Sequence, residues 1–127
     1  LRATEIDGSA FKLNNNLVLY NKISELIVRD KLYLESDITL SKLSTLIGIT
    51  TQQTSTIINQ YAKRNFNDFI NFQRIQFAKK LLSSPDNEKF TISSIAFDTG
   101  FSSLSSFNSA FKKFEGITPS IYRKSQS

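Results

Sequence analysis

One supersecondary pattern occurs twice in this chain of 127 residues, and it restricts the fold more than any other feature. Each copy has two short segments in which apolar residues repeat every three or four positions, separated by a glycine. That spacing places the apolar side chains on one face of an α-helix, and a glycine at the break adopts positive φ at little cost. The pattern therefore predicts two helices joined by a tight turn, formed once in each half of the chain.

The copy nearer the C-terminus breaks at Gly100, after Ile92, Ile95 and Ala96 have shared one helical face. The helix after the break has an apolar face of Leu104, Phe107, Ala110, Phe111 and Phe114, and a polar face of Ser105, Asn108, Ser109 and Lys112. A short helix held steeply across another is able to enter the major groove of DNA. The polar face is therefore a candidate DNA-reading surface, and an ordinary solvated helix face is the alternative interpretation.

The earlier copy begins at Thr39, whose hydroxyl suits the cap of a helix that contains Leu40, Leu43 and Ile47 and ends at Gly48. A further helix begins just after this glycine. Its apolar face comprises Ile57, Ile58 and Tyr61, joined by Thr54, and its polar face comprises Gln52, Ser55, Thr56 and Asn59. This polar face is again rich in amides and hydroxyls, so it is a second candidate reading surface.

The two copies align residue by residue. Up to the turn the aligned residues are Thr39, Leu40, Leu43, Gly48 and Ile49 in the first copy and Thr91, Ile92, Ile95, Gly100 and Phe101 in the second. After an insertion of one residue they are Thr54, Ile58, Phe66 and Phe69 in the first copy and Phe107, Phe111, Pro119 and Tyr122 in the second. An internal repeat is a far more specific signal than either copy alone, and it predicts an all-α fold with two helix-turn-helix subdomains.

A long apolar periodicity between the copies predicts one connecting helix over residues 66–83. At about 1.5 Å per residue this helix is about 27 Å long, and successive major grooves on one side of a duplex are about 34 Å apart. We therefore expect it to hold the two polar faces near the groove spacing. A stripe that includes Leu17 and Ile27 predicts a bracing helix over residues 13–34. The expected divisions are a linker at 1–12, a first subdomain at 13–82 and a second at 83–127.

Composition excludes most enzyme chemistry. The chain has no cysteine and no histidine, which removes disulfides, thiolate and imidazole metal sites, and Ser-His or Cys-His nucleophile pairs. We expect neither a catalytic residue nor a cofactor. The net charge of +5 suits a nucleic-acid binder and an ordinary soluble protein alike. Because no apolar run approaches about 20 residues and no signal peptide is present, we expect a cytoplasmic domain without membrane contact.

These residues resemble the DNA-binding domain of the AraC/XylS family of bacterial transcription regulators, over about Tyr33 to Lys124. The second copy contributes Ile95-Ala96, Gly100-Phe101-Ser102-Ser103, Ser106-Phe107, Ala110-Phe111-Lys112-Lys113, Gly116-Ile117-Thr118-Pro119-Ser120 and Tyr122-Arg123. The first half contributes Leu40, Leu43, Ile49-Thr50, Ile57-Ile58, Phe66, Phe69, Arg74-Ile75, Ala78 and Leu81-Leu82. Three residues depart from the family pattern: Thr54 replaces a large apolar residue, Ser44 an alanine and Lys63 a glycine.

The resemblance implies about seven helices in two homeodomain-like three-helix units joined by a long helix. It also implies sequence-specific binding of double-stranded DNA in two successive major grooves, by the output domain of a transcription activator that contacts RNA polymerase. A sensor or dimerisation region is expected before this segment, in keeping with a chain that starts at Leu1 and contains no methionine.

On this interpretation the contacts divide into base reading and phosphate positioning. Base reading is assigned to Gln52, Ser55, Thr56 and Asn59 in the first subdomain and to Leu104, Ser105, Asn108 and Ser109 in the second. Phosphate contact is assigned to Thr50, Thr51, Ser102 and Ser103 near the helix N-termini, where amides favour anions, and to Lys63, Arg64, Lys112, Lys113, Arg123 and Lys124. Arg74 matches a family residue for which a structural role is an alternative, and it is not assigned.

The polar faces carry no arginine before Arg64, so the common bidentate contact to guanine is missing. Amide side chains suit adenine, and Leu104 or the Thr56 methyl suits the thymine methyl, which predicts an A/T-leaning site. About 5 neutralised phosphates predict that log affinity falls with log salt at a slope of about −4 to −5. The alternative function is a protein-binding module with weak or non-specific DNA binding, marked by an exposed apolar patch. An enzyme is least favoured, because the carboxylates, serines and lysines show no paired spacing.

Overall fold

The computed structural model describes residues 8–126 of the chain, with side chains from residue 15 onward, and in that range every regular element is helical. The elements are α1 (Gly8–Ser24), a π-helical turn η2 (Glu25–Arg29), a 3₁₀ turn η3 (Leu32–Leu34), α2 (Leu40–Ile47), α3 (Thr51–Ala62), α4 (Phe66–Ser83), a 3₁₀ turn η4 (Pro85–Asn87), α5 (Ile92–Asp98), α6 (Leu104–Glu115) and α7 (Pro119–Ser125). The expected all-α fold is confirmed. In the described part of the chain no helix is both long enough and apolar enough to cross a bilayer.

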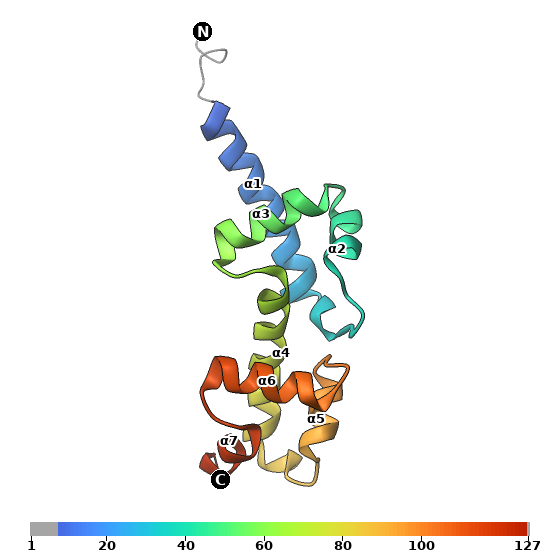
Figure 1. Cartoon of the computed structure of the whole chain (residues 1–127), viewed down its shortest axis with the longest axis vertical. Coiled ribbons are helices and arrows are strands. Elements are labelled where there is room, and N and C mark those ends of the chain that lie inside the picture. Colours follow the sequence, from blue (N-terminus) through green and yellow to red (C-terminus); the bar gives the residue numbers. More distant parts are fainter. Residues whose placement is uncertain (1–7, 127) are drawn as a thin grey trace.

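The molecule is elongated, and α4 lies along its long axis between two helical groups (Figure 1). Each group has its own apolar core. The first half of α4 contributes Phe69 and Ile70 to a core shared with α1, α2 and α3. The second half contributes Ile75, Ala78 and Leu82 to a core shared with α5 and α6. One helix therefore belongs to both subdomains, and this shared helix fixes their separation along the axis.

The predicted repeat is present as two sets of helix ends at corresponding positions of the sequence. Helix α3 has its N-cap at Thr50 and its C-cap at Lys63, and α6 has its N-cap at Ser103 and its C-cap at Gly116. Both pairs of positions are related by the offset that the aligned core residues predict. Thr39 caps α2 by accepting a hydrogen bond from the Lys42 amide at 3.1 Å, as its hydroxyl and position indicated.

The N-terminal region differs from the expectation of a linker at 1–12 and one helix over 13–34. Helix α1 begins at Gly8, inside the expected linker, because glycine and serine are tolerated where the first amides have no intrahelical acceptor. Residues 1–7 of that linker lie outside the described residues. The helix does not continue to Leu34: the Asp30 amide bonds to the Glu25 carbonyl at 2.8 Å, a π-type closure, and Lys31 then adopts φ 60°.

Leu17 is exposed, although the apolar stripe placed it in the core. The first turns of α1 extend past the body of the first subdomain (Figure 1), so they have no neighbouring helix to cover them. The buried part of the stripe starts further along, with Ile23 and Ile27.

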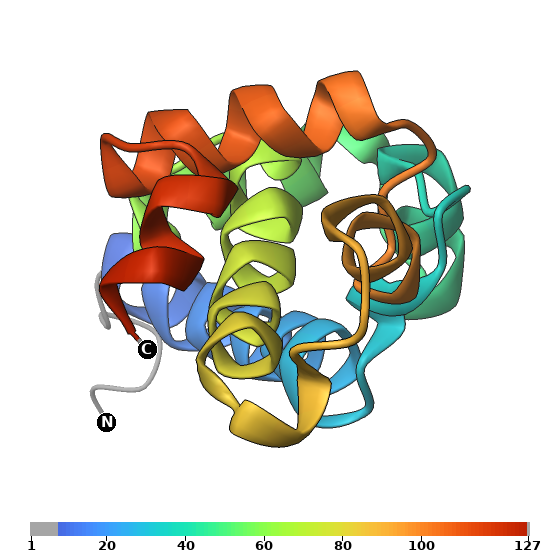
Figure 2. The ribbon, with the colours of Figure 1, turned by 90° about the horizontal axis from the view of Figure 1, so that it is seen from below.

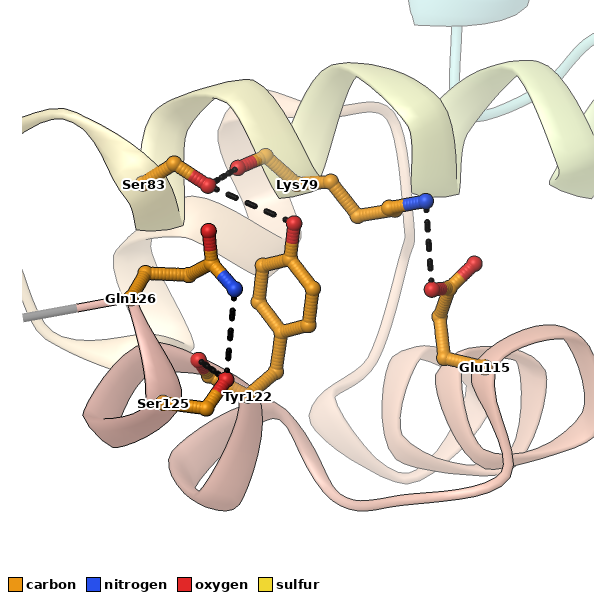
Figure 3. Close-up of polar contacts among 6 residues, drawn as sticks. All are labelled: Lys79, Ser83, Glu115, Tyr122, Ser125 and Gln126. Carbon is orange, nitrogen blue, oxygen red and sulfur yellow. Dashed lines mark hydrogen bonds and ion pairs between the residues drawn. The ribbon is translucent and has the colours of Figure 1, made fainter.

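The second subdomain is fastened to α4 by a set of polar contacts drawn in Figure 3. Lys79 Nζ on α4 pairs with Glu115 Oε1 at the end of α6 at 3.1 Å, and both side chains are partly buried. One turn further along α4, the Ser83 hydroxyl donates to the Lys79 carbonyl at 2.7 Å and lies 3.3 Å from the Tyr122 hydroxyl of α7. The C-terminal end of α6 is thereby held against the connecting helix.

Candidate nucleic-acid interface

Helices α3 and α6 lie on the same side of the molecule. In Figure 1 both cross the long axis in front of the other elements and run in a similar direction, one above the other. In Figure 2, seen from below, α6 crosses the top of the picture with α3 partly hidden behind it, and α1 lies on the opposite side. The two second helices of the helix-turn-helix units thus run in a similar direction along one side of the protein.

The two faces of each of these helices separate by polarity as the sequence predicted. Thr54, Ile57 and Ile58 are the buried residues of α3, and Phe107, Ala110 and Phe111 are those of α6. All the residues assigned to base reading are exposed except Ser55: Gln52, Thr56, Asn59, Leu104, Ser105, Asn108 and Ser109. Two amphipathic helices with solvent-facing amides and hydroxyls are therefore in place.

Ser55 is the assigned base-reading residue that the structure leaves least accessible. It is half-buried and lines a shallow hollow with Ile38, Leu40 and Phe66. The Asn59 side-chain amide donates to the Ser55 carbonyl at 2.9 Å. Contact between the Ser55 hydroxyl and a base would require access through that hollow, so Ser55 is the weakest member of the set.

The N-termini of both helices are capped by hydroxyls, and this capping decides which amides remain for a ligand. The Thr50 hydroxyl accepts from the Gln53 amide, while the Gln53 side chain accepts from the Thr50 amide, each at 3.0 Å. In α6 the cap is Ser103, whose hydroxyl accepts from the Ser106 amide at 3.1 Å. The amides of the first two residues of each helix have no acceptor within the helix, and such amides point along the helix axis from its N-terminus.

Lys113, Arg64 and Arg123, which were assigned to phosphate contact, have partners within the protein. Lys113 Nζ pairs with Asp68 Oδ2 at 2.7 Å, from α6 to α4. The Arg64 guanidinium lies 4.0 Å from the centroid of the Phe72 ring. Arg123 donates from Nη1 to the Phe90 carbonyl at 2.7 Å and from Nη2 to the Asn87 carbonyl at 3.2 Å. These side chains stabilise the junctions between elements, a role that their charge alone did not reveal.

The remaining assigned positions are at the surface. Lys63 is exposed at the end of α3 and Lys112 is exposed on α6. Thr51, Ser102 and Lys124 are also exposed.

A pair of buried hydroxyls explains two of the departures noted in the first subdomain. The Ser44 and Thr54 hydroxyls are 2.7 Å apart where α2 crosses α3. The Thr54 hydroxyl also bonds to the Thr50 carbonyl at 2.9 Å, and the Ser44 hydroxyl to the Leu40 carbonyl at 2.7 Å. The two departures are therefore complementary: the hydroxyls contact each other as well as carbonyls of their own helices, and neither is left unsatisfied at this crossing.

Arg74 is the residue whose role the sequence left open. Its side chain is 8% exposed, Nε donates to the Tyr33 carbonyl at 2.7 Å and Nη2 donates to the Glu35 carbonyl at 2.9 Å. Burial lowers the pKa of the Arg74 guanidinium from its ordinary value. The signal in the sequence was its register, since Arg74 stands four residues after Ile70 and four before Ala78, on the buried face of α4.

Comparisons with known proteins agree with the two helix-turn-helix units seen in the structure. A family model described as a helix-turn-helix domain matches residues 43–125. An HTH-type transcriptional regulator of Staphylococcus aureus is 33% identical over 110 residues, which are 87% of this chain and 14% of the relative. The chain therefore spans about a seventh of the length of the Staphylococcus aureus relatives that it matches.

Solved structures share the fold. The C-terminal domain of AraT, a response regulator from Geobacillus stearothermophilus, is 26% identical with a TM-score of 0.74, and the match covers 84% of each chain. The DNA-binding domain of AdpA, solved in complex with a target DNA, has a TM-score of 0.72 at 15% identity, covering 83% of this chain and 89% of the AdpA chain. The AdpA likeness concerns the fold alone.

Proposed function

This chain belongs to the AraC-type family of helix-turn-helix DNA-binding domains of transcription regulators, and on that premise we propose that it binds double-stranded DNA sequence-specifically with α3 and α6 in successive major grooves. Its family is one of DNA-binding domains rather than enzymes. The observation that carries the proposal is that α3 and α6 run in a similar direction along one side of the elongated molecule (Figures 1 and 2), each with its polar residues exposed apart from the half-buried Ser55.

In this complex the amide and hydroxyl side chains of α3 and α6 read base edges. Gln52 and Asn59 in α3, and Asn108 in α6, offer the paired donor and acceptor that suit adenine. The Thr56 methyl and Leu104, which is 38% exposed at the start of α6, offer apolar contact to the thymine methyl. Ser105 and Ser109 supply short hydroxyls on the flank of α6. The site is therefore A/T-leaning.

The phosphates are held mainly by helix N-termini and by the exposed lysines. The first amides of α3 and α6 point along the helix axes toward the duplex, and the helix dipoles add favourable potential for an anion. Lys63, Lys112 and Lys124 add positive charge. The main role of Arg64, Lys113 and Arg123 is to stabilise contacts between elements of the protein. They bind phosphates only through N–H groups that are not used in those internal contacts.

Selection of binding sites from a random DNA library tests the proposal. The wild-type domain should enrich a bipartite A/T-leaning site whose halves are one helical turn apart, about 10 base pairs. Gln52→Ala should relax selection in one half and Asn108→Ala in the other, each with a loss of about 1–3 kcal/mol in binding free energy. Asn21→Ala is the matched control, because Asn21 is an exposed amide on α1, outside the two helices assigned to base reading.

Two results would contradict the proposal. An enriched site rich in G/C would show that the amide side chains do not read the bases as assigned. Equal effects of Gln52→Ala, Asn108→Ala and Asn21→Ala would show that the assigned faces do not contact DNA. Titrations of the selected site in increasing salt give an independent measurement, with an expected log–log slope of about −4 to −5.

A protein-binding module is the second candidate. Exposed apolar side chains do occur, among them Leu46, Phe97 and Ile121, but they lie on α2, α5 and α7. On α3 and α6 the exposed large apolar side chain is Leu104. This distribution favours DNA as the partner of the two polar faces.

We extend the proposal to the whole protein through its relatives, which are HTH-type regulators much longer than this segment. The segment acts as the output domain of a bacterial regulator in the cytoplasm, joined to a sensor or dimerisation region, and activates transcription by contact with RNA polymerase. Reporter expression from a promoter that carries the selected site, with and without the full-length protein, distinguishes activation from repression.

A further inference from the structure

The two apolar cores of this protein do not merge. On α4 the fully buried residues of the first core end at Ile70 and those of the second begin at Ile75, while the half-buried Phe77 also packs against the first. Arg74 occupies the seam between them. Among the residues whose burial is described, it is the one buried side chain with a formal charge. A buried charge is costly unless its donors are satisfied, and among the described residues no buried side-chain nitrogen or oxygen lacks a hydrogen-bond partner.

The donors of Arg74 bind the first subdomain. Nε and Nη2 bond to the Tyr33 and Glu35 carbonyls of the η3 segment, and Nη1 lies 3.3 Å from Asn71 Oδ1 on α4 itself. On its other side the guanidinium meets the second subdomain, with its carbon over the Phe101 ring at 5.4 Å from the centroid. A single planar side chain therefore contacts both subdomains, in a geometry that a lysine cannot reproduce.

The turn of the second helix-turn-helix unit closes over this side chain. A Cβ on Gly100 would lie 2.5 Å from the Tyr33 carbonyl oxygen and 2.7 Å from Arg74 Nε. The equivalent turn residue of the first unit, Gly48, has nothing within 4 Å of the same point. Gly100 is thus required for close approach between subdomains as well as for its φ of 107°, whereas Gly48 is required for its φ alone.

We propose that Arg74 is a positioning residue: clamped between the η3 carbonyls and the turn at Gly100 and Phe101, it fixes the orientation of α6 relative to α3 and so sets the half-site spacing that the protein accepts. This inference rests on the proposed function and adds a determinant of spacing to it. Helix α4 fixes the axial separation of the subdomains, and the clamp fixes their rotation about α4. If α3 and α6 are held rigidly, DNA with one half-site spacing binds tightly, because the protein loses little conformational freedom on binding.

A distance measurement without DNA tests the clamp directly. The chain contains no cysteine, so spin labels can be placed at Leu46→Cys on α2 and Phe97→Cys on α5, both exposed and away from the polar faces. Pulsed electron spin resonance should give one narrow distance distribution in the otherwise wild-type protein. Arg74→Met, which keeps an unbranched stem out to the position of Nε and removes all the donors, should broaden or shift that distribution while circular dichroism retains the helical signal.

Two matched pairs keep this test informative. Arg29→Met removes the same charge from an exposed site in the first subdomain and should leave the distribution unchanged. Gly100→Ala should broaden it, whereas Gly48→Ala, which introduces backbone strain without a clash, should leave it narrow. If Arg74→Met fails to fold, the comparison of Gly100→Ala with Gly48→Ala tests the clamp in its place. Narrow, unshifted distributions in Arg74→Met or, in its place, in Gly100→Ala would overturn the inference.

Spacing variants of the selected DNA site give the functional readout. The probes are the enriched site and the same site with 5 base pairs inserted between its halves, about half a helical turn. The wild-type protein should lose at least about tenfold in affinity on insertion, because the second reading helix can no longer engage. Arg74→Met should bind the original site more weakly and should lose less than about threefold on insertion.

The outcomes separate the two proposals. If wild-type protein enriches no bipartite site, the proposed function fails, while the distance measurement still tests the clamp. If wild-type protein discriminates spacing and Arg74→Met discriminates it equally, the clamp does not set spacing and the proposed function stands. A spacing profile relaxed in Arg74→Met but unchanged in Arg29→Met supports the inference.

Discussion

The two helix-turn-helix subdomains have the same backbone plan and different chemistry at the point where their helices cross. In the first, Ser44 on α2 meets Thr54 on α3, and both hydroxyls are buried and bonded. In the second, the equivalent residues are Ala96 and Phe107, and Phe107 packs against the Phe101 and Phe111 rings at centroid distances of 5.3 and 5.7 Å. A crossing of this geometry therefore accepts either a hydrogen-bonded pair or an aromatic cluster.

The difference shows where each subdomain obtains its stability. Burial of an aromatic ring contributes much more than a net hydrogen bond, so the second core gains more from this crossing than the first. The directional bond between Ser44 and Thr54 instead favours one register of α2 against α3. The two subdomains also differ where these helices end. Both C-cap residues adopt the left-handed conformation, but the residue is Lys63 in α3 and Gly116 in α6.

The largest expected effect comes from truncating the two crossing residues in parallel. Phe107→Ala should lower the free energy of unfolding by about 3–5 kcal/mol, because it removes a fully buried ring and leaves a cavity. Thr54→Ala should lower it by about 1–2 kcal/mol, since one buried hydrogen-bonded hydroxyl is lost. Urea unfolding followed by circular dichroism measures both. A cost for Thr54→Ala equal to that of Phe107→Ala would show that the first crossing depends on its hydroxyls far more than its contacts indicate.

A double-mutant cycle sharpens the comparison by making the first crossing apolar. Ser44→Ala and Thr54→Val should each cost about 1 kcal/mol, and the double variant should cost less than the sum, with a coupling of about 0.5–1.5 kcal/mol. Ala96→Ser is the control in the second subdomain, where the added hydroxyl meets the Phe107 ring instead of a partner hydroxyl. Strict additivity in the cycle would mean that the two hydroxyls act independently.

Exchanging the C-cap residues of α3 and α6 should change the free energy of unfolding in opposite directions in the two helices. Lys63 has φ 58° and Gly116 has φ 78°. Lys63→Gly should raise the free energy of unfolding by about 0.5–1 kcal/mol and Gly116→Lys should lower it similarly, because a side chain in the left-handed region is strained. Lys63→Gly should also make the salt slope of DNA binding shallower by about 1. Thermal unfolding and salt titrations measure the two effects, and an unchanged slope would remove Lys63 from the phosphate contacts.

The smallest expected effect is a pH dependence confined to the first subdomain. A hydrogen bond and charge attraction from Lys42 lower the pKa of the Asp37 carboxyl, at the start of α2; the position equivalent to Asp37 before α5 is Lys89. A lowered folded-state pKa stabilises the protein above the unfolded value of about 3.9 and ceases to do so as pH falls through the folded value. Nuclear magnetic resonance titration of Asp37 should show this pKa, and Lys42→Met should restore the ordinary one. An unshifted pKa in the wild-type protein would exclude the ion pair in solution.

Much of the fold could be predicted because local signals agree with each other. Gly48 and Gly100 mark the turns, Thr39 marks a helix start, and the spacing of the apolar residues predicts α4 at its observed bounds, Phe66–Ser83. The exposure of Gln52 and Asn108 follows from the same periodicity, because a side chain opposite a buried stripe faces solvent. The base contacts themselves remain predictions until the DNA experiments are done.

The amino-acid sequence by itself determined the helices, their turns, the internal repeat and the polarity of each helix face, because these depend on residues within a few positions of one another. Only the tertiary structure decided that Arg64, Lys113 and Arg123 have internal partners, that Ser44 and Thr54 meet, and that Arg74 joins the two cores. Those contacts connect residues as far apart as Asp68 and Lys113, and periodicity carries no information about which distant groups come together. The physical reason is that a charge or hydroxyl looks the same in sequence whether water or a carbonyl satisfies it, and packing alone makes that choice.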